Sequence, residues 1–207
     1  MLRRANIAVL VSGGGTNLQA LIDAQSSGII ESGEITLVIS NKPDAYALER
    51  ARRAGIPTAV VEKRDFCDKA AFEERITELL DNANIDVIVL AGFMVILSER
   101  FTTHFKDRII NVHPSLIPSF CGEGYYGLRV HEAALAYGVK VSGATVHLVN
   151  EIPDGGRILM QRAVEVREDD TPETLQRRIM EEAEWKILPL SCELVCKQIV
   201  NRENKEI

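Results

Sequence analysis

The feature that most constrains the fold is a regular alternation of short apolar runs with segments of helical spacing, from residue 7 to residue 112. The apolar runs have the length of strands and are continuous, as in strands buried on both faces. They lie at 7–11, 35–39, 58–61, 85–91 and 108–112. Strands that alternate with helices form βαβ units, and βαβ units build parallel sheets. This part of the chain therefore predicts a mostly parallel, Rossmann-like sheet.

Helices are predicted between these strands. The first follows a glycine-rich turn and is marked by Leu18, Leu21 and Ile22. Three others are predicted from Asp44 to Ala54, along the face formed by Phe72, Ile76, Leu79 and Leu80, and from Leu97 to Phe105. The second is an arginine-rich segment, and its Arg50, Arg52 and Arg53 are interpreted as a solvated helix face.

After His131 the pattern changes. Val141 to Val149 and Ile158 to Val166 predict an antiparallel pair across a turn that contains Asp154. A long final helix then begins at Thr171, a capping residue followed by proline. Pro189 is expected to kink or break this helix. We predict one α/β domain over residues 1–207, with a C-terminal β-hairpin and a long last helix.

Composition narrows the function classes. The net charge is −6, from 24 basic and 30 acidic residues, which argues against a general nucleic-acid binder. The four cysteines lack C-x-x-C spacing and are expected to be reduced thiols, with no metal site. No stretch approaches 18 apolar residues, and the N-terminus does not resemble a signal peptide. We therefore expect a cytoplasmic protein without a membrane partner.

Ser12 to Asn17 reads Ser-Gly-Gly-Gly-Thr-Asn and joins the first strand to the first helix. Glycines allow close backbone approach, and N–H groups at a helix N-terminus favour an anion such as phosphate. Leu18 stands where a dinucleotide fingerprint needs glycine, and no Gly-Lys-Ser/Thr follows as in a Walker loop. From these residues alone, a phosphate site and a tight turn without a ligand both remain open.

Asn111 and His113 follow a buried strand, where ligands of open parallel sheets bind. Their side chains point to one side of the strand end, and together they suit an oxyanion that forms when an amine attacks a carbonyl. A pair of turn-stabilising residues is the alternative. Asp154 suits either a common Asp-Gly turn or a carboxylate that raises the pKa of a histidine. His147 is interpreted as structural, and His131 is ambiguous.

Four motifs occur in order: Ser12-Gly-Gly-Gly-Thr-Asn-Leu-Gln, Leu90-Ala-Gly-Phe-Met, Asn111-Val-His-Pro-Ser-Leu-Ile-Pro and Asp154-Gly-Gly. In this arrangement the chain resembles the glycinamide ribonucleotide formyltransferases, from about Asn6 to about Pro189. The resemblance implies transfer of a formyl group from 10-formyltetrahydrofolate, a co-substrate, to the amine of glycinamide ribonucleotide in purine synthesis. It also implies that residues 1–110 bind phosphate and that 111–207 bind folate and catalyse.

Site roles follow from the same resemblance. Asn111 and His113 would stabilise the oxyanion, and Asp154 would raise the pKa of His113. The ribonucleotide would be held by Gly15, Thr16, Asn17 and Glu184. The folate would meet Lys69, Met94, Val95, Ile96, Leu97 and Asn111. No metal is implied, and the enzyme would be a monomer or a homodimer.

The sequence departs from the family pattern at three places. Val95 and Lys69 stand at or near positions where arginines are expected, and lysine lacks the bidentate fork of arginine. Residues 119–127 form a longer, glycine-rich stretch that we predict to be a mobile flap. The competing interpretations are a formyltetrahydrofolate hydrolase, a methionyl-tRNA formyltransferase, and a nucleotide-binding module without catalytic activity. The first two would need additional domains, and the last would not need the Asn111, His113 and Asp154 set.

Overall fold

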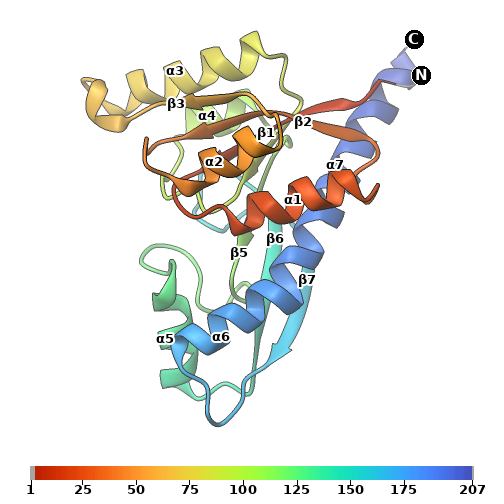
Figure 1. Ribbon diagram of the computed structural model, residues 1–207. Coiled ribbons are helices and arrows are strands. Elements are labelled where there is room, and N and C mark those ends of the chain that lie inside the picture. The colour runs from red at the N-terminus through yellow and green to blue at the C-terminus, as the bar shows by residue number, and fades with distance from the viewer. Residues whose placement is uncertain (1–2, 207) are drawn as a thin grey trace.

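The computed structural model describes residues 3–206. It contains one seven-stranded sheet in the order β3-β2-β1-β4-β5-β6-β7 (Figure 1). The strands are β1 (Ala5–Val11), β2 (Gly33–Ser40), β3 (Thr58–Val60), β4 (Val87–Leu90), β5 (Ile109–His113), β6 (Val141–Leu148) and β7 (Ile158–Glu165). The first five strands in this order, from β3 at the edge through β2, β1 and β4 to β5, pair in parallel. β6 runs antiparallel to both β5 and β7. The predicted α/β class and the hairpin are confirmed.

The helices are α1 (Thr16–Ser26), α2 (Tyr46–Arg53), α3 (Lys69–Asn82), α4 (Glu99–His104), α5 (Leu128–Tyr137), α6 (Pro172–Ile179) and α7 (Trp185–Glu206). A 3-10 turn, η1 (Lys63–Asp65), precedes α3, and a π-helical turn, η2 (Met180–Glu184), joins α6 to α7. The predicted helices between strands exist, with ends shifted by a few residues. α4 begins after Ser98 because the Ser98 hydroxyl accepts from the Phe101 N–H.

Both faces of the sheet are covered over β1, β2, β4 and β5, which explains their continuous apolar runs, whereas β7 at the edge is mostly exposed. One core lies between the sheet and α1, α2, α6 and α7, and includes Ile7, Val9 and Leu18. The other lies beneath α3 and α4 and includes Leu10 and Phe72. Figure 1 shows α7 running obliquely beside α1 and the sheet. No helix within residues 3–206 is both long and apolar enough to cross a membrane.

The last helical segment differs from the sequence expectation. Thr171 caps α6 with a reciprocal capping box to Thr174, and Pro172 lies in the first turn, as predicted. Pro189 does not break the helix, because α7 continues through it. It lies in the second turn of α7, five residues after the π-helical turn η2 ends. The irregular backbone therefore lies upstream of the proline, at Met180–Glu184.

Candidate active site

The glycine loop lies at the carboxyl end of β1, where ligands of such sheets bind. Gly15 is the N-cap of α1 in a left-handed conformation (φ 73°), and its carbonyl accepts from the Gln19 N–H at 2.9 Å. A Cβ on Gly15 would lie 2.6 Å from the Cβ of Ala47, so only glycine fits. No side chain caps α1, which leaves its first N–H groups open to an anion.

Asn17 joins this loop to the C-terminal helices. Its Nδ2 donates to the Glu184 carboxylate at 2.7 Å, and Thr16 contacts the sulfur of Met180 at 3.9 Å. Glu184 ends the π-helical turn and is buried. Burial raises its pKa to about 7, and the Asn17 hydrogen bond opposes this shift. The structure thus brings together three residues assigned to the ribonucleotide, Thr16, Asn17 and Glu184.

His113 and Asp154 are brought together from different elements. His113 ends β5, and Asp154 lies in the β6–β7 connection with φ 55°. The His113 Nδ1 lies 3.5 Å from the Asp154 Oδ2, and both side chains are largely buried. The Gly122 N–H donates to the same Oδ2 at 2.8 Å. The carboxylate is therefore fixed against the imidazole by the backbone of the 119–127 segment.

A second histidine, His147, belongs to this cluster, which the sequence interpretation as a structural residue did not include. β5 and β6 pair Asn111 with His147, and the His147 Nε2 lies 3.2 Å from the Asn111 Nδ2 and 3.5 Å from the Asp154 Oδ1. Its Nδ1 donates to the Leu148 carbonyl at 2.8 Å. Alternation with Thr145 was the one sequence signal, and it does not reveal the strand register.

Asp154 raises the pKa of His113 as the sequence analysis expects, but the burial of His113 has the larger effect. Burial lowers the pKa of His113, and the nearby Asp154 carboxylate only partly raises it again. The His113 Nε2 donates to the Phe120 carbonyl at 2.8 Å. Burial raises the pKa of Asp154, but the His147 hydrogen bond and the charge of His113 lower it by more, so the pKa of Asp154 is below its usual value. The ligand-free cluster is thus an ionised carboxylate beside a histidine that is harder to protonate than usual.

The segment assigned to folate follows β4. The Met94 N–H donates to the Ser12 hydroxyl at 2.9 Å, which ties this segment to the glycine loop. Met94 and Ile96 are exposed and Val95 is half-buried, whereas the Leu97 side chain packs into the core beneath α3 and α4. The Leu97 side chain is therefore turned away from the surface of this segment.

Lys69 begins α3 and lies 3.6 Å from the buried carboxylate of Glu73. Glu73 also accepts from the Ser98 N–H at 2.9 Å. Lys69 is thus linked through Glu73 to the end of the 94–98 segment. No hydrogen bond or ion pair joins it to His113 or Asp154 among the described residues.

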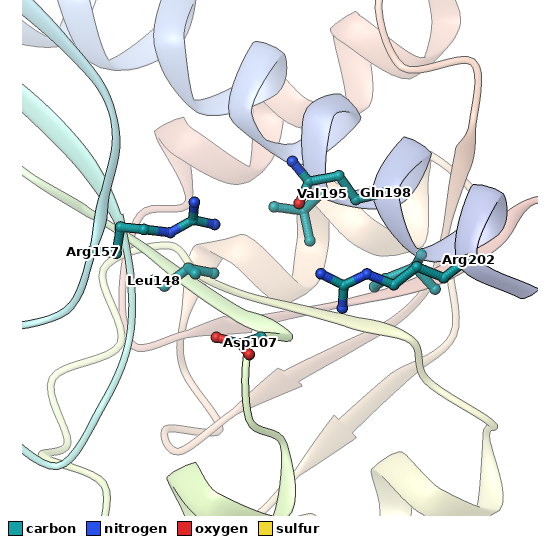
Figure 2. Close-up of a pocket in the computed structure, with 7 residues that line it drawn as sticks. Asp107, Leu148, Arg157, Val195, Gln198 and Arg202 are labelled. Atoms are coloured by element: carbon teal, nitrogen blue, oxygen red, sulfur yellow. The ribbon is translucent and has the colours of Figure 1, made fainter.

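Other features lie apart from this cluster. A cavity of about 270 Å³ is lined by Asp107, Leu148, Arg157, Val195, Gln198, Ile199 and Arg202. Figure 2 shows the side chains of Asp107, Arg157 and Arg202 among those around it. Asp107 precedes β5 and Arg157 precedes β7, so this cavity lies away from the carboxyl ends of the parallel strands. Among the side chains that the structure describes, residues 3–202, no group of three histidine, cysteine or acidic residues could hold a metal. All four cysteines are free.

The chain is similar in sequence and in fold to known proteins. A family model described as formyl transferase matches residues 5–191. Phosphoribosylglycinamide formyltransferase of Haemophilus influenzae is 45% identical over 184 residues, which cover 89% of this chain and 84% of that protein. The crystal structure of glycinamide ribonucleotide transformylase 1 from Symbiobacterium toebii matches with a TM-score of 0.88 and 42% identity, over 94% of this chain and 89% of that one.

A further relative is much longer. The trifunctional purine biosynthetic protein adenosine-3 of Bos taurus is 44% identical over 200 residues, which cover 96% of this chain. The chain spans 19% of the length of that relative and 13% of its Drosophila melanogaster counterpart. The family match over most of the chain and the similarity to relatives that it covers over most of their own length lead to one assignment. The chain belongs to the formyl transferase family, in the group of the phosphoribosylglycinamide formyltransferases.

Proposed function

We propose that this chain transfers the formyl group of 10-formyltetrahydrofolate to the amine of glycinamide ribonucleotide. The single observation that carries the proposal is the approach of His113 to Asp154, 3.5 Å apart at the carboxyl end of β5. Acyl transfer to an amine needs donors for an oxyanion and a group that manages a proton. Both lie here, on the same edge of the sheet as a glycine loop suited to phosphate.

In the proposed reaction the amine nitrogen attacks the formyl carbon, and the bond from that carbon to N10 breaks. The attacking nitrogen loses one proton and N10 gains one, so the reaction is balanced without an added oxidant or reductant. The Asn111 amide and the His113 Nε2–H donate to the oxygen while it carries negative charge. The Asp154 carboxylate stabilises positive charge on His113 and assists the passage of the proton, through water, from the attacking amine to N10.

The Phe120 carbonyl bears on this step. It now accepts from the His113 Nε2 at 2.8 Å, which is the hydrogen bond that the oxyanion would take in the reaction. Phe120 also has a left-handed backbone, φ 49°, which is uncommon for a bulky residue. Withdrawal of this carbonyl fits the flap predicted at 119–127, and the motion of that flap stays a prediction.

The two substrates are assigned to opposite sides of the cluster. The ribonucleotide phosphate would meet Gly15, Thr16 and Asn17, with Glu184 as a further contact. The pterin would lie along the backbone of Met94, Val95, Ile96 and Leu97, with Asn111 between both substrates and Lys69 towards the folate tail. Residues 1–110 would thus serve mainly the phosphate and 111–207 mainly the chemistry. Small molecules are the proposed partners, and a cytoplasmic monomer or homodimer is the proposed state.

A transfer assay with and without glycinamide ribonucleotide tests the proposal, using wild type and Asp154→Asn. Asparagine tolerates a left-handed backbone as aspartate does, so this variant changes the charge at φ 55° without added strain. We expect kcat to fall on the order of 100-fold or more, by analogy with other losses of electrostatic stabilisation.

Asp107→Asn is the matched control, because Asp107 is exposed, also left-handed at φ 60°, and lies in the turn before β5. It should behave like wild type. Formyl release without the ribonucleotide would show that the chain is a hydrolase and not a transferase. Binding of the ribonucleotide without turnover would leave a nucleotide-binding module.

A further inference from the structure

The glycine loop is held from behind by α2. The Ala47 N–H donates to the Gly13 carbonyl at 3.0 Å. The Arg50 Nε donates to the next carbonyl, that of Gly14, at 2.9 Å. Two successive carbonyls of the loop are therefore turned towards the same helix. The sequence interpretation placed Arg50 with Arg52 and Arg53 on a solvated face, and for Arg50 that interpretation is wrong.

These two contacts determine where the loop N–H groups point. A trans peptide is planar, and its N–H points opposite to its C=O. With the Gly13 and Gly14 carbonyls directed at α2, the N–H groups of Gly14 and Gly15 are directed away from it. Neither N–H has an acceptor among residues 3–206. Gly13 and Gly14 are exposed, so these donors are open to an incoming anion.

Arg50 itself is held in place and keeps its charge available. Its Nη1 donates to the Gln19 side chain at 3.1 Å, and its guanidinium lies 5.1 Å from the centre of the Tyr46 ring. No carboxylate of the described residues lies within ion-pair distance of Arg50, whereas Arg52 and Arg53 both pair with Glu49. Arg50 and Thr16 also line one hollow of about 690 Å³ beside α1.

We infer that Arg50 is a positioning residue of the glycine loop: it holds the Gly14 peptide so that N–H groups face the phosphate of the ribonucleotide, and its positive charge, which no carboxylate of the described residues neutralises, lies behind the loop. The inference rests on the proposed function, because it needs a phosphorylated substrate at this loop. It predicts an effect on one substrate only. The folate site is tied to the loop through Ser12 and Met94, on a different contact.

The test compares Arg50→Gln, Arg50→Lys and Arg53→Gln in steady-state kinetics with each substrate varied. Arg53 is the matched control because it is exposed, lies on the same helix and contacts Tyr46 and Glu49 but not the loop. Arg50→Gln should raise KM for glycinamide ribonucleotide on the order of tenfold or more, since a charge-assisted contact is lost. Its kcat and its KM for the folate should change by less than about threefold, within the range of weak surface effects.

Arg50→Lys should recover part of the loss, because lysine restores the charge but cannot donate the two separate hydrogen bonds to Gly14 and Gln19. Arg53→Gln should match wild type. Equal rises in both KM values, or no rise in either, would overturn the inference. Thermal unfolding of each variant checks that the fold is kept, and the lysine variant keeps the test informative if the glutamine variant is unstable.

Direct titration with inorganic phosphate and with glycinamide ribonucleotide separates this inference from the proposed function. If the wild type showed no formyl transfer but Arg50→Gln bound both probes more weakly than wild type, the role of Arg50 would be supported and the transferase activity rejected. Turnover that is normal in Arg50→Gln would keep the transferase and reject Arg50. If wild type bound neither probe, both would fail.

Discussion

At the scale of single residues, His131 shows what burial does to an imidazole. It lies in the first turn of α5, its side chain is fully buried, and neither ring nitrogen has a hydrogen-bond partner among the described residues. Burial and the charge of His113 lower its pKa to about 4. The folded protein therefore keeps His131 neutral at pH values where the unfolded chain, with an ordinary pKa near 6.5, takes up a proton.

This difference predicts a loss of stability in acid. The contribution of neutral His131 is fully present above about pH 6.5, and it falls as the pH drops towards 4, because only the unfolded chain gains a proton in that range. The loss should reach roughly 3 kcal/mol. Urea unfolding between pH 4 and 8 measures it. His131→Phe should flatten this part of the profile, because phenylalanine keeps a planar ring and does not titrate.

His104→Gln serves as the control, because His104 is exposed and pairs with Asp81 on the surface. It should leave the acid limb unchanged. An acid limb in His131→Phe as steep as in wild type would assign the loss to other groups. The phenylalanine variant should also be no less stable than wild type at pH 8, because it removes two buried nitrogens that lack partners.

At the scale of elements, β1, β2, β4 and β5 were predictable because both faces of the sheet are covered over these strands, so their sequences are continuous apolar runs. Asn111 and His113 were also predictable, since alternation places both at one strand end. The approach of Asp154 was not predictable, because it depends on the β6–β7 connection and on the Gly122 N–H. The role of His147 depends on the β5–β6 register, which no local pattern specifies.

The contact of Arg50 with the loop escaped prediction for a similar reason. Three arginines on one short helix read alike in sequence, and only the packing of α2 against Gly15 separates them. The same packing also means that the three glycines of the loop differ in the space available for a side chain, which their sequence does not reveal. A Cβ on Gly15 meets Ala47 at 2.6 Å, whereas one on Gly13 or Gly14 meets nothing within 4 Å.

Gly15→Ala should therefore destabilise the protein, and Gly14→Ala should not. The first combines a left-handed backbone, φ 73°, with a clash against α2. Its cost should exceed about 1 kcal/mol, the usual penalty for alanine at such a position. Chemical denaturation of both variants measures the difference. Equal stability of the two would mean that α2 yields easily, and would also weaken the argument that α2 holds the loop.

At the scale of the whole molecule, the phosphate and catalytic parts share one sheet and one long helix. β4 and β5 pair directly across the boundary near residue 110. α7 packs against α1, β1, β2 and β4 on one side of that boundary and against β6 and β7 on the other. The Asn17–Glu184 hydrogen bond joins the first helix to the π-helical turn. The core beneath α3 and α4 is built from residues up to Ile109, but the core on the other face of the sheet contains residues of both parts.

This arrangement predicts a single cooperative unfolding transition. Trp185 is the only tryptophan and lies at the start of α7, so its fluorescence reports the C-terminal helices, while far-UV circular dichroism reports the whole chain. Both signals should give the same urea midpoint, because a two-state protein loses all its structure together. A tryptophan transition clearly ahead of the dichroism would show that α7 leaves first and that the two parts fold separately. Glycinamide ribonucleotide at a hundred times its Kd should raise the free energy of unfolding by about 2.7 kcal/mol. Both urea midpoints should then shift upward together.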